Sequence, residues 1–523
     1  MDAVPDTKSP LADQASAEPK TTAFEAEPLP AFTHPQVRQV VFGILLCILL
    51  AAIDQTVVVP AVPSIAADLN GFGHLSWIVS AYLLTSTAAT PIYGKLSDIY
   101  GRRALLLPAI VLFVIASMLC ALSQTLLQLI LSRALQGLGG AGLMAMSQAA
   151  IADVVAPRER GRYQGYMAGT WGVASVAGPI LGGWMTDDLS WRWIFWINLP
   201  IGIAAYMLSS SALKLLKHRR QPSRIDYLGA ALLSVAVTVA LLVMSWGGTE
   251  YAWTSPTILG LCVVVVAVVG AFLVQERRAS DPLLPPRLFT NGVFSRGVLV
   301  ASLTAGGMFG AVFLLPLYFQ LIRGADASLS GTLIVPYLTA NCVGAFTSGQ
   351  IARRLGKAKL IIQAGLAGSV LGFALLATLQ ADTNVVLAEA YMLLVGMGIG
   401  VCLPSTLVVV QNAAERRDVG SATGALLFLR SMGGAMGSTL VGAVLAGSFA
   451  AGVAAQGITT VIDLGALRGA EGTRITLPPE VQGVAQAALS GGFHMAFAVC
   501  ACVMAAAFAA CWGLRDLPLR GGR

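Results

Sequence analysis

The sequence predicts an all-α integral membrane protein with fourteen transmembrane helices, arranged as two six-helix bundles with two additional helices between them. Three observations predict this class. The 523-residue chain is 56% hydrophobic and only 11% charged, whereas soluble domains carry about 25% charged residues. Apolar runs of about 20 residues, long enough to cross a bilayer, recur along the chain. A charged segment at 94–103, with glycines seven apart, has a counterpart at 349–357, which indicates a duplicated membrane protein.

The expected organisation follows these apolar runs in chain order. Residues 1–36 are rich in Pro, Ala and acidic side chains without periodicity, so we expect a disordered cytoplasmic tail. The expected domains are an N-terminal six-helix bundle over 37–215, two additional helices with linkers over 216–290, a C-terminal six-helix bundle over 291–515 with an outer loop at 448–492, and a tail over 516–523. The spans are expected at 38–63, 75–96, 104–123, 126–152, 162–184, 191–214, 226–246, 256–275, 294–321, 329–351, 359–379, 385–410, 418–447 and 493–513.

Lys and Arg residues are concentrated in every second loop between these spans. The segments around Arg102, Arg160, Arg219 and Arg353 are basic, whereas the alternate loops hold few basic residues. Because basic loops stay in the cytoplasm, both termini are expected to be cytoplasmic. The net charge of +7 is explained by this bias, so we expect no nucleic-acid partner. The eight cysteines and four histidines lack ligand spacing, and no metal site is expected.

The first span contains a carboxylate, Asp54, well inside an apolar stretch. Such a group costs about 2.5–3.5 kcal/mol on insertion scales, so it usually faces a cavity or a partner. Arg133 in the fourth span lies at a similar depth if helices rise 1.5 Å per residue. Two interpretations stay open: a structural Asp–Arg pair, or a carboxyl that exchanges a proton or meets a cationic substrate. Gln136, Gly137 and Gly140 beside Arg133 indicate a hydrated, closely packed face.

The fifth span carries a run of small residues from Gly172 to Gly183. Small residues allow helices to pack closely, and Pro179 removes a backbone donor and kinks a helix. Packing alone could explain the glycines. The combination Gly178-Pro179 followed by Gly182-Gly183 suits a hinge or a sealed contact between the halves.

These segments together resemble the major facilitator superfamily. The segment Gly94–Arg103 resembles its motif A, Arg133–Gly140 its motif B, and Gly172–Gly183 its motif C. The Asp54-Gln55-Thr56 stretch and Trp191–Gly202 are similar to signatures of the fourteen-spanner drug:proton antiporters. The resemblance covers about residues 38–515, with the motifs in the family's order.

The resemblance implies roles for the residues that match these motifs. Arg133 would tune proton exchange at Asp54, and the motif C contact would favour export over uptake. Two departures stand out: Ile99 occupies a position that is often basic in motif A, and the second copy has Arg353 where the first has Asp98. The remaining implied residues are the gating positions Gly94, Asp98, Gly101, Arg102 and Arg103, and the motif C positions Gly178, Pro179, Gly182 and Gly183.

Polar and aromatic residues of the helices that border the central cavity in this family are candidate substrate contacts. For aromatic residues the competing interpretation is a lipid-facing belt. Glu389 is expected at the membrane interface, and Arg430 lies in the middle of a span with no assigned role. The cavity candidates are Gln55, Gln136, Phe309, Phe313, Gln320, Tyr337 and Asn341.

We expect a proton-coupled antiporter that exports lipophilic, cationic drugs or toxic compounds by alternating access. No phosphate-binding loop of the form Gly-x4-Gly-Lys-Ser/Thr is present, so the expected energy source is the proton gradient, without a cofactor, and no enzyme is expected. Three alternatives stay open: an exporter of one metabolite or antibiotic, a nutrient-uptake symporter, and a non-transporting membrane scaffold. The resemblance implies a monomer in the bacterial inner (cell) membrane, with protons, drug-like molecules and lipid as partners.

Overall fold

The computed structural model describes residues 34–69, 76–215, 225–248, 250–325, 327–455 and 479–515. Fourteen long helical segments run through these ranges, and no β-strand occurs in them beyond one isolated bridge between Gly247 and Tyr251. The segments of the N-terminal half are α1 (His34–Asp68), α2 (Ser76–Tyr100), α3 (Arg102–Ala121), α4 (Leu126–Val154), α5 (Pro157–Asp188), and the pair α6 (Trp193–Trp196) and α7 (Asn198–Ala212). This all-helical architecture confirms the predicted fold class.

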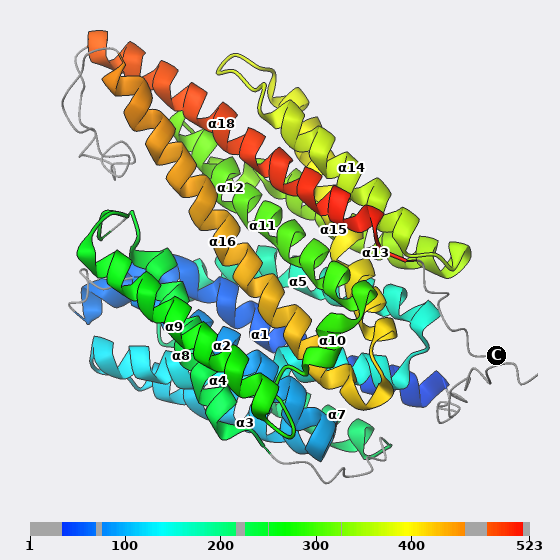
Figure 1. Ribbon diagram of the computed structural model, residues 1–523. Coiled ribbons are helices and arrows are strands. Elements are labelled where there is room, and N and C mark those ends of the chain that lie inside the picture. Colours follow the sequence, from blue (N-terminus) through cyan, green and yellow to red (C-terminus); the bar gives the residue numbers. More distant parts are fainter. Residues whose placement is uncertain are drawn as a thin grey trace, which may run out of the picture.

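The remaining helices form an inserted hairpin and the C-terminal half (Figure 1). The hairpin consists of α8 (Tyr227–Trp246) and α9 (Pro256–Arg278), and the short helix α10 (Pro286–Thr290) follows it. The C-terminal half comprises α11 (Gly292–Leu321), α12 (Ala327–Leu333), α13 (Val335–Leu355), α14 (Lys359–Leu376), α15 (Val385–Ala413), α16 (Val419–Ala454) and α18 (Pro479–Trp512).

Twelve of the described helices are long and apolar enough to cross a membrane. The two long helices outside this set are α2 and α5, which carry many Ser, Thr and Gly residues. Both pack against the opposite half, α2 against α16 and α5 against α13. These contacts cover part of each helix with protein, which allows a more polar composition there.

Two segments differ from the sequence-based boundaries. The outer loop predicted over 448–492 is shorter, because α16 continues to Ala454 and α18 begins at Pro479. These flanks are rich in alanine, the strongest helix former, so the helices extend beyond their apolar cores. The first helix begins at His34, inside the predicted tail. The predictions for 1–33, the basic linker 217–224 and 516–523 lie outside the described residues.

The hairpin lies on the side of the molecule where α2 and α16 meet, as Figure 1 shows. Its second helix, α9, presents exposed apolar side chains such as Leu259, Val263 and Val266, as expected for a lipid-facing helix. Its first helix is capped by Asp226, whose carboxylate accepts hydrogen bonds from the Gly229 amide and the Gln275 side chain. The residue therefore has a structural role at the helix end.

The two halves contact each other mainly near one end of the bundle, which we call the inner end because it carries residues 94–103. Here Gly94 lies against Gly420 and Gly424, and Gly349 lies against Gly161. The helices of the two halves run side by side at this end and diverge toward the other, outer end (Figure 1). The structure therefore shows a transporter-like bundle pair that is closed at the inner end.

Candidate functional site

The centre of the N-terminal half is a buried polar cluster around Asp54, which we call the Asp54 centre. Asp54 is fully buried and Arg133 is 1% exposed. One carboxylate oxygen, Oδ2, lies 2.6 Å from Arg133 Nη1. The other, Oδ1, accepts hydrogen bonds from Gln136 Nε2 at 2.7 Å and Asn198 Nδ2 at 2.9 Å. Three donors thus surround a carboxylate that has no contact with solvent.

Several neighbours besides Asp54 hold the Arg133 side chain in place. Its Nη1 also donates to Gln136 Oε1 at 2.8 Å, and its Nε donates to the Ile78 carbonyl at 3.2 Å. The guanidinium carbon lies 4.6 Å from the centre of the Tyr82 ring, within cation–π distance. Burying two charges is costly unless each is paired and hydrogen-bonded. Here both conditions are met, and the cluster is neutral as a whole.

Glycines bring the helices that carry this cluster together. A Cβ at Gly137 would collide with the Tyr82 carbonyl and the Thr85 side chain, and one at Gly140 would collide with the Tyr82 hydroxyl. The close approach of α2 and α4 places Tyr82 over Arg133. The close approach agrees with the closely packed face that the sequence predicts beside Arg133, and the side chains there are buried in this conformation.

Asn198 is a member of the Asp54 centre that sequence reasoning missed. It is fully buried at the start of α7, and its amide also donates to Ser117 Oγ at 3.0 Å. Its side-chain carbonyl oxygen is buried without a hydrogen-bond partner among the described residues. The available signal was an amide within the apolar stretch Trp193–Gly202, because buried polar groups in membranes mark sites.

A second polar cluster, the inner gate, joins the halves at the segment 94–103. Asp98 on α2 accepts hydrogen bonds from the Gly420 amide at 2.8 Å and the Ser421 amide at 2.7 Å, at the first turn of α16. The Ser421 hydroxyl also donates to it, at 2.8 Å. A carboxylate at a helix N-terminus is favoured by the free amides and by the helix dipole. Asp98 therefore caps a helix of the opposite half.

Arg102 holds Asp98 in place from the other side. Its Nη1 lies 2.8 Å from Asp98 Oδ1, and its Nε lies 2.8 Å from Asp153 Oδ2 on α4; Nη1 also contacts the Ser97 hydroxyl. Gly101, with a φ of 90°, makes the turn before α3 that directs Arg102 inward. Asp153 completes this cluster and was not predicted, whereas Arg103 is exposed and makes no described contact with the gate.

The motif C residues on α5 lie against α1. A Cβ at Gly178 would collide with Thr56, and one at Gly182 with the Val57 carbonyl. Thr56 in turn donates its hydroxyl to the Ala174 carbonyl at 2.9 Å. Gly183 has open space around it. The contact therefore seals two helices of the same half, α1 and α5, and the predicted contact between halves does not form at Gly178.

The predicted cavity residues separate into two groups. Phe309 and Phe313 are 44% and 37% exposed and lie beside α16 near Gly434 and Gly442. Gln55 is partly buried and reaches the Tyr82 hydroxyl at 3.5 Å. These placements are compatible with a cavity between the halves, whereas Gln136 is part of the Asp54 centre.

Three predicted cavity residues of the C-terminal half, Tyr337, Asn341 and Gln320, have different surroundings. Tyr337 is 1% exposed within the core of that half, and its hydroxyl donates to the Met308 carbonyl. The helical spacing that pairs Tyr337 with Asn341 does not determine which neighbour their face meets, and in this conformation Tyr337 packs inside its own half. The backbone of Asn341 lies against Gly400, and its side-chain nitrogen is buried without a hydrogen-bond partner among the described residues. Gln320 donates to Ser330 at 2.9 Å near the outer end.

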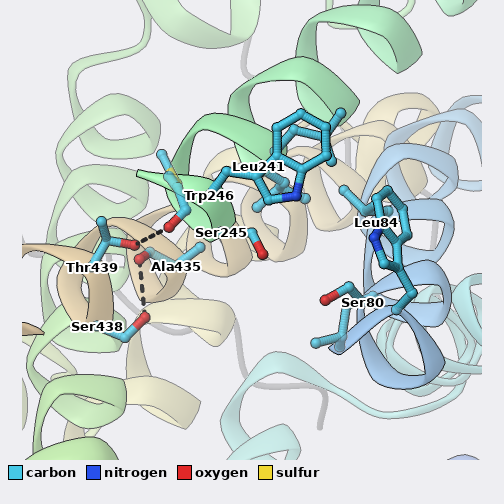
Figure 2. Close-up of a pocket in the computed structure, with 12 residues that line it drawn as sticks. Ser80, Leu84, Leu241, Ser245, Trp246, Ala435, Ser438 and Thr439 are labelled. Carbon is cyan, nitrogen blue, oxygen red and sulfur yellow. Dashed lines mark hydrogen bonds between the residues drawn. The ribbon is translucent and has the colours of Figure 1, made fainter. Parts of the chain in front are cut away.

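A pocket of about 210 Å³ lies between the hairpin and both halves (Figure 2). Trp246 of α8 contacts Trp77 of α2 edge to face, with ring centres 6.3 Å apart. Thr439 of α16 donates to the Met244 carbonyl of α8 at 3.5 Å. The pocket therefore lies at the side of the bundle, where the inserted hairpin bridges the diverging halves, and it is separate from the Asp54 centre.

The fold and the inner gate define a membrane transporter-like protein built from two related bundles. Residues 44–438 match the Major Facilitator Superfamily, and the chain belongs to this family. It is 39% identical, over 78% of this chain and 60% of the other, to an uncharacterized MFS-type transporter of Mycobacterium tuberculosis (strain H37Rv). It is 36% identical, over 77% of this chain and 74% of the other, to the multidrug transporter protein MdtP of Bacillus subtilis (strain 168).

The chain thus spans about 60% of the length of the mycobacterial relative. Among solved structures, the proton:xylose symporter XylE superposes with a TM-score of 0.62 at 14% identity, covering 93% of this chain and 97% of that one. The human organic anion transporter MFSD10 superposes with a TM-score of 0.61 at 17% identity, covering 92% and 100%. At these identities the superpositions show the fold alone.

Proposed function

We propose that this protein exports lipophilic compounds from the cytoplasm by alternating access, driven by protons that move inward through Asp54. The observation that carries the proposal is the fully buried Asp54–Arg133 pair inside a bundle whose halves touch at the inner end. The names of relatives, among them a multidrug transporter and a multidrug resistance protein of Bacillus subtilis, support export of drug-like compounds.

The coupling follows from the charge balance of the Asp54 centre. With Asp54 ionised, the pair with Arg133 is neutral. With Asp54 protonated, Arg133 keeps only neutral partners, the Ile78 carbonyl and Gln136, and the packed arrangement loses its main attraction. Because Asp54 has no solvent contact here, a proton reaches it only when the surrounding helices move. Protonation and rearrangement are therefore linked, and each charge that crosses gains about 2.3 kcal/mol per 100 mV.

The inner gate supplies the conformational part of the cycle. The cap that Asp98 forms on α16 is available only when the inner ends of α2 and α16 meet. We propose that this contact holds the outward-facing state and breaks when the protein opens to the cytoplasm. The short chain of contacts from Asp98 through Arg102 to Asp153 on α4, the helix that also carries Arg133, connects the gate to the Asp54 centre.

The proposed substrate is a lipophilic cation. A cationic compound would be attracted to Asp54, but it would have to displace Arg133, Gln136 and Asn198 from a closed cluster. We propose that a lipophilic cation and a proton compete for the N-terminal half through this rearrangement. The protein would act as a monomer in the bacterial cell membrane with both termini in the cytoplasm, using the proton gradient and no cofactor.

The test compares Asp54→Asn with Asp68→Asn. Asp68 is a partly exposed carboxylate at the end of α1, paired with Arg192 at 2.9 Å, and serves as the matched control. In cells, Asp54→Asn is expected to abolish ethidium efflux while Asp68→Asn retains it. Purified wild-type protein is expected to release protons when ethidium is added, and Asp54→Asn is not. Unchanged efflux by Asp54→Asn would show that Asp54 is only a structural partner of Arg133.

A further inference from the structure

Arg430 is a charged residue in the interior of the C-terminal half that neither the Asp54 centre nor the inner gate uses. It follows the start of α16 by eleven residues, about 17 Å at 1.5 Å per residue. Every other Asp, Glu, Lys or Arg described in the spanning helices of this half lies within five residues of a helix end. Arg430 is therefore the only one of them placed at mid-membrane depth.

No residue in the described part of the chain pairs with Arg430. It makes no ion pair, hydrogen bond or cation–π contact there, and no other ionisable group acts on it. Arg133, at the centre of the N-terminal half, has a carboxylate, an amide and a carbonyl as partners. A guanidinium always carries its charge and five donors, so an unpaired one inside a membrane protein is costly and is retained where it has a task.

The neighbours of Arg430 on α16 show the direction in which this side of the helix points. Residues 427, 430 and 434 share one face because they are three and four apart. Leu427 packs against the core of the N-terminal half, and Gly434 lies against the ring of Phe309 on α11. Arg430 is thus on the face of α16 directed between the two halves, and it is partly exposed. The pocket in Figure 2 involves a different face, through Ala435, Ser438 and Thr439.

One helical turn toward the outer end, this face meets an aromatic surface. Phe309 and Phe313 are 44% and 37% exposed and follow each other by four residues on α11, so they share a face. A positive donor group beside exposed aromatic rings is suited to an amphipathic molecule whose acidic group meets the guanidinium and whose apolar body meets the rings. A purely cationic ligand would be repelled by Arg430 at this place.

We propose that Arg430 recognises an acidic group, such as a carboxylate, of lipophilic substrates bound between the halves. The inference rests on the proposed transport function, because it assigns the bound ligand to the transport cavity. It adds a substrate class: lipophilic acids and zwitterions. A zwitterion fits this arrangement because its acidic group pairs with Arg430 while its cationic group lies toward the N-terminal half.

The experiment measures binding of two dyes that differ only at a carboxyl group. Rhodamine 110 carries a free carboxylate, and rhodamine 123 is its methyl ester. Binding to the purified full-length protein is followed by fluorescence polarisation for wild type, Arg430→Gln, Arg430→Lys and a control, Arg296→Gln. Arg296 lies on α11 near the inner end, where it contacts the Gly513 carbonyl and is exposed, so its replacement removes a charge from the same half but not from the cavity.

Arg430→Gln is expected to weaken rhodamine 110 binding by about 10- to 100-fold, the usual effect of losing a charge-assisted hydrogen bond, and to leave rhodamine 123 binding unchanged or tighter. Arg430→Lys is expected to recover most of the affinity for rhodamine 110, and Arg296→Gln to match wild type. Equal loss of both dyes, loss of neither, or a wild type that does not bind rhodamine 110 overturns the proposal.

Transport separates this proposal from the proposed function. In everted vesicles with an acidic interior, wild type is expected to accumulate both dyes, and Arg430→Gln only rhodamine 123. Carboxylate-selective binding without any gradient-driven accumulation would refute proton-coupled export and leave the Arg430 assignment standing. Accumulation of both dyes by wild type and Arg430→Gln alike would refute the Arg430 assignment and leave proton-coupled export standing.

Discussion

At the inner end, α2 meets α16 and α13 meets α5, and in each pair the first glycine of a repeated turn segment lies against the backbone of the opposite half. Gly94 lies against Gly420, and Gly349 lies against Gly161. Among the described residues, the first pair alone adds a carboxylate, Asp98, that caps the facing helix. The duplicated segment therefore supplies close backbone approach in both places, and in its first copy it also supplies a directional polar contact.

This difference indicates how the two contacts can behave when the protein changes conformation. Close backbone packing depends on shape and is lost as soon as a side chain intrudes. A carboxylate cap depends on charge and alignment, so it can break when the helix end moves and reform when it returns. We therefore expect the contact of α13 with α5 to be sensitive to volume, and the contact of α2 with α16 to be sensitive to charge.

The largest effect is expected for Gly349→Ala. Its new Cβ would collide with backbone atoms of Gly161 and Arg162, which cannot move aside as a side chain can. Overpacking of this kind costs about 1–3 kcal/mol, and here it destabilises the state that is closed at the inner end. Ethidium efflux should therefore fall by about 5- to 150-fold. The control is Gly331→Ala, which has open space around it and should keep wild-type efflux. Equal efflux by both variants would show that the contact is loose in the membrane.

The next effect tests the charge at the other contact. Asp98→Asn keeps the size of the side chain but removes the charge that accepts from two backbone amides and Arg102. Hydrogen bonds to charged groups contribute about 1.5–3 kcal/mol, so we expect a shift toward the state open at the inner end. Spin labels at the exposed residues Tyr100 and Leu355 should report a longer distance between halves. Asp153→Asn, which removes one bond to Arg102, should give a smaller change.

A third variant tests whether Gly178, in the outer part of α5, packs only within its own half. Gly178→Ala would push against Thr56 on α1, so the melting temperature of the purified protein should drop by several degrees, for about 1–3 kcal/mol of overpacking. The nearby Gly183→Ala, which meets open space, should leave it unchanged. The inner-end distance should stay as in wild type for both variants. A longer inner-end distance in Gly178→Ala would show that this contact also controls the gate.

The smallest effect is expected where the hairpin linker reaches the inner gate. Arg287 on α10 lies 2.8 Å from Asp418, the residue before α16, but the Arg287 side chain is 51% exposed. Exposed ion pairs contribute about 0–1 kcal/mol, so Arg287→Gln should shift the melting temperature by no more than a few degrees and preserve efflux. A large loss of efflux in this variant would mean that the hairpin helps to hold the gate closed.

Much of this protein could be predicted from its sequence because membrane helices must satisfy local rules. Apolar length alone indicated the spans, the duplicated glycine spacing indicated the two halves, and the isolated charges Asp54 and Arg133 indicated a pair at one depth, which the structure joins at 2.6 Å. The limits of the outer loop were wrong because alanine-rich flanks continue α16 and α18 beyond their apolar cores.

Only the tertiary structure decided which partners these residues have. The cap of Asp98 on Ser421 joins positions 323 residues apart, and the bond of Asn198 to Asp54 joins positions 144 apart. Such contacts depend on the crossing of helices, which hydrophobic length does not encode. For the same reason the sequence did not show that Tyr337 is buried in the core. In the sequence Arg430 is one more mid-span charge, whereas in the structure it faces the opposite half without a partner among the described residues.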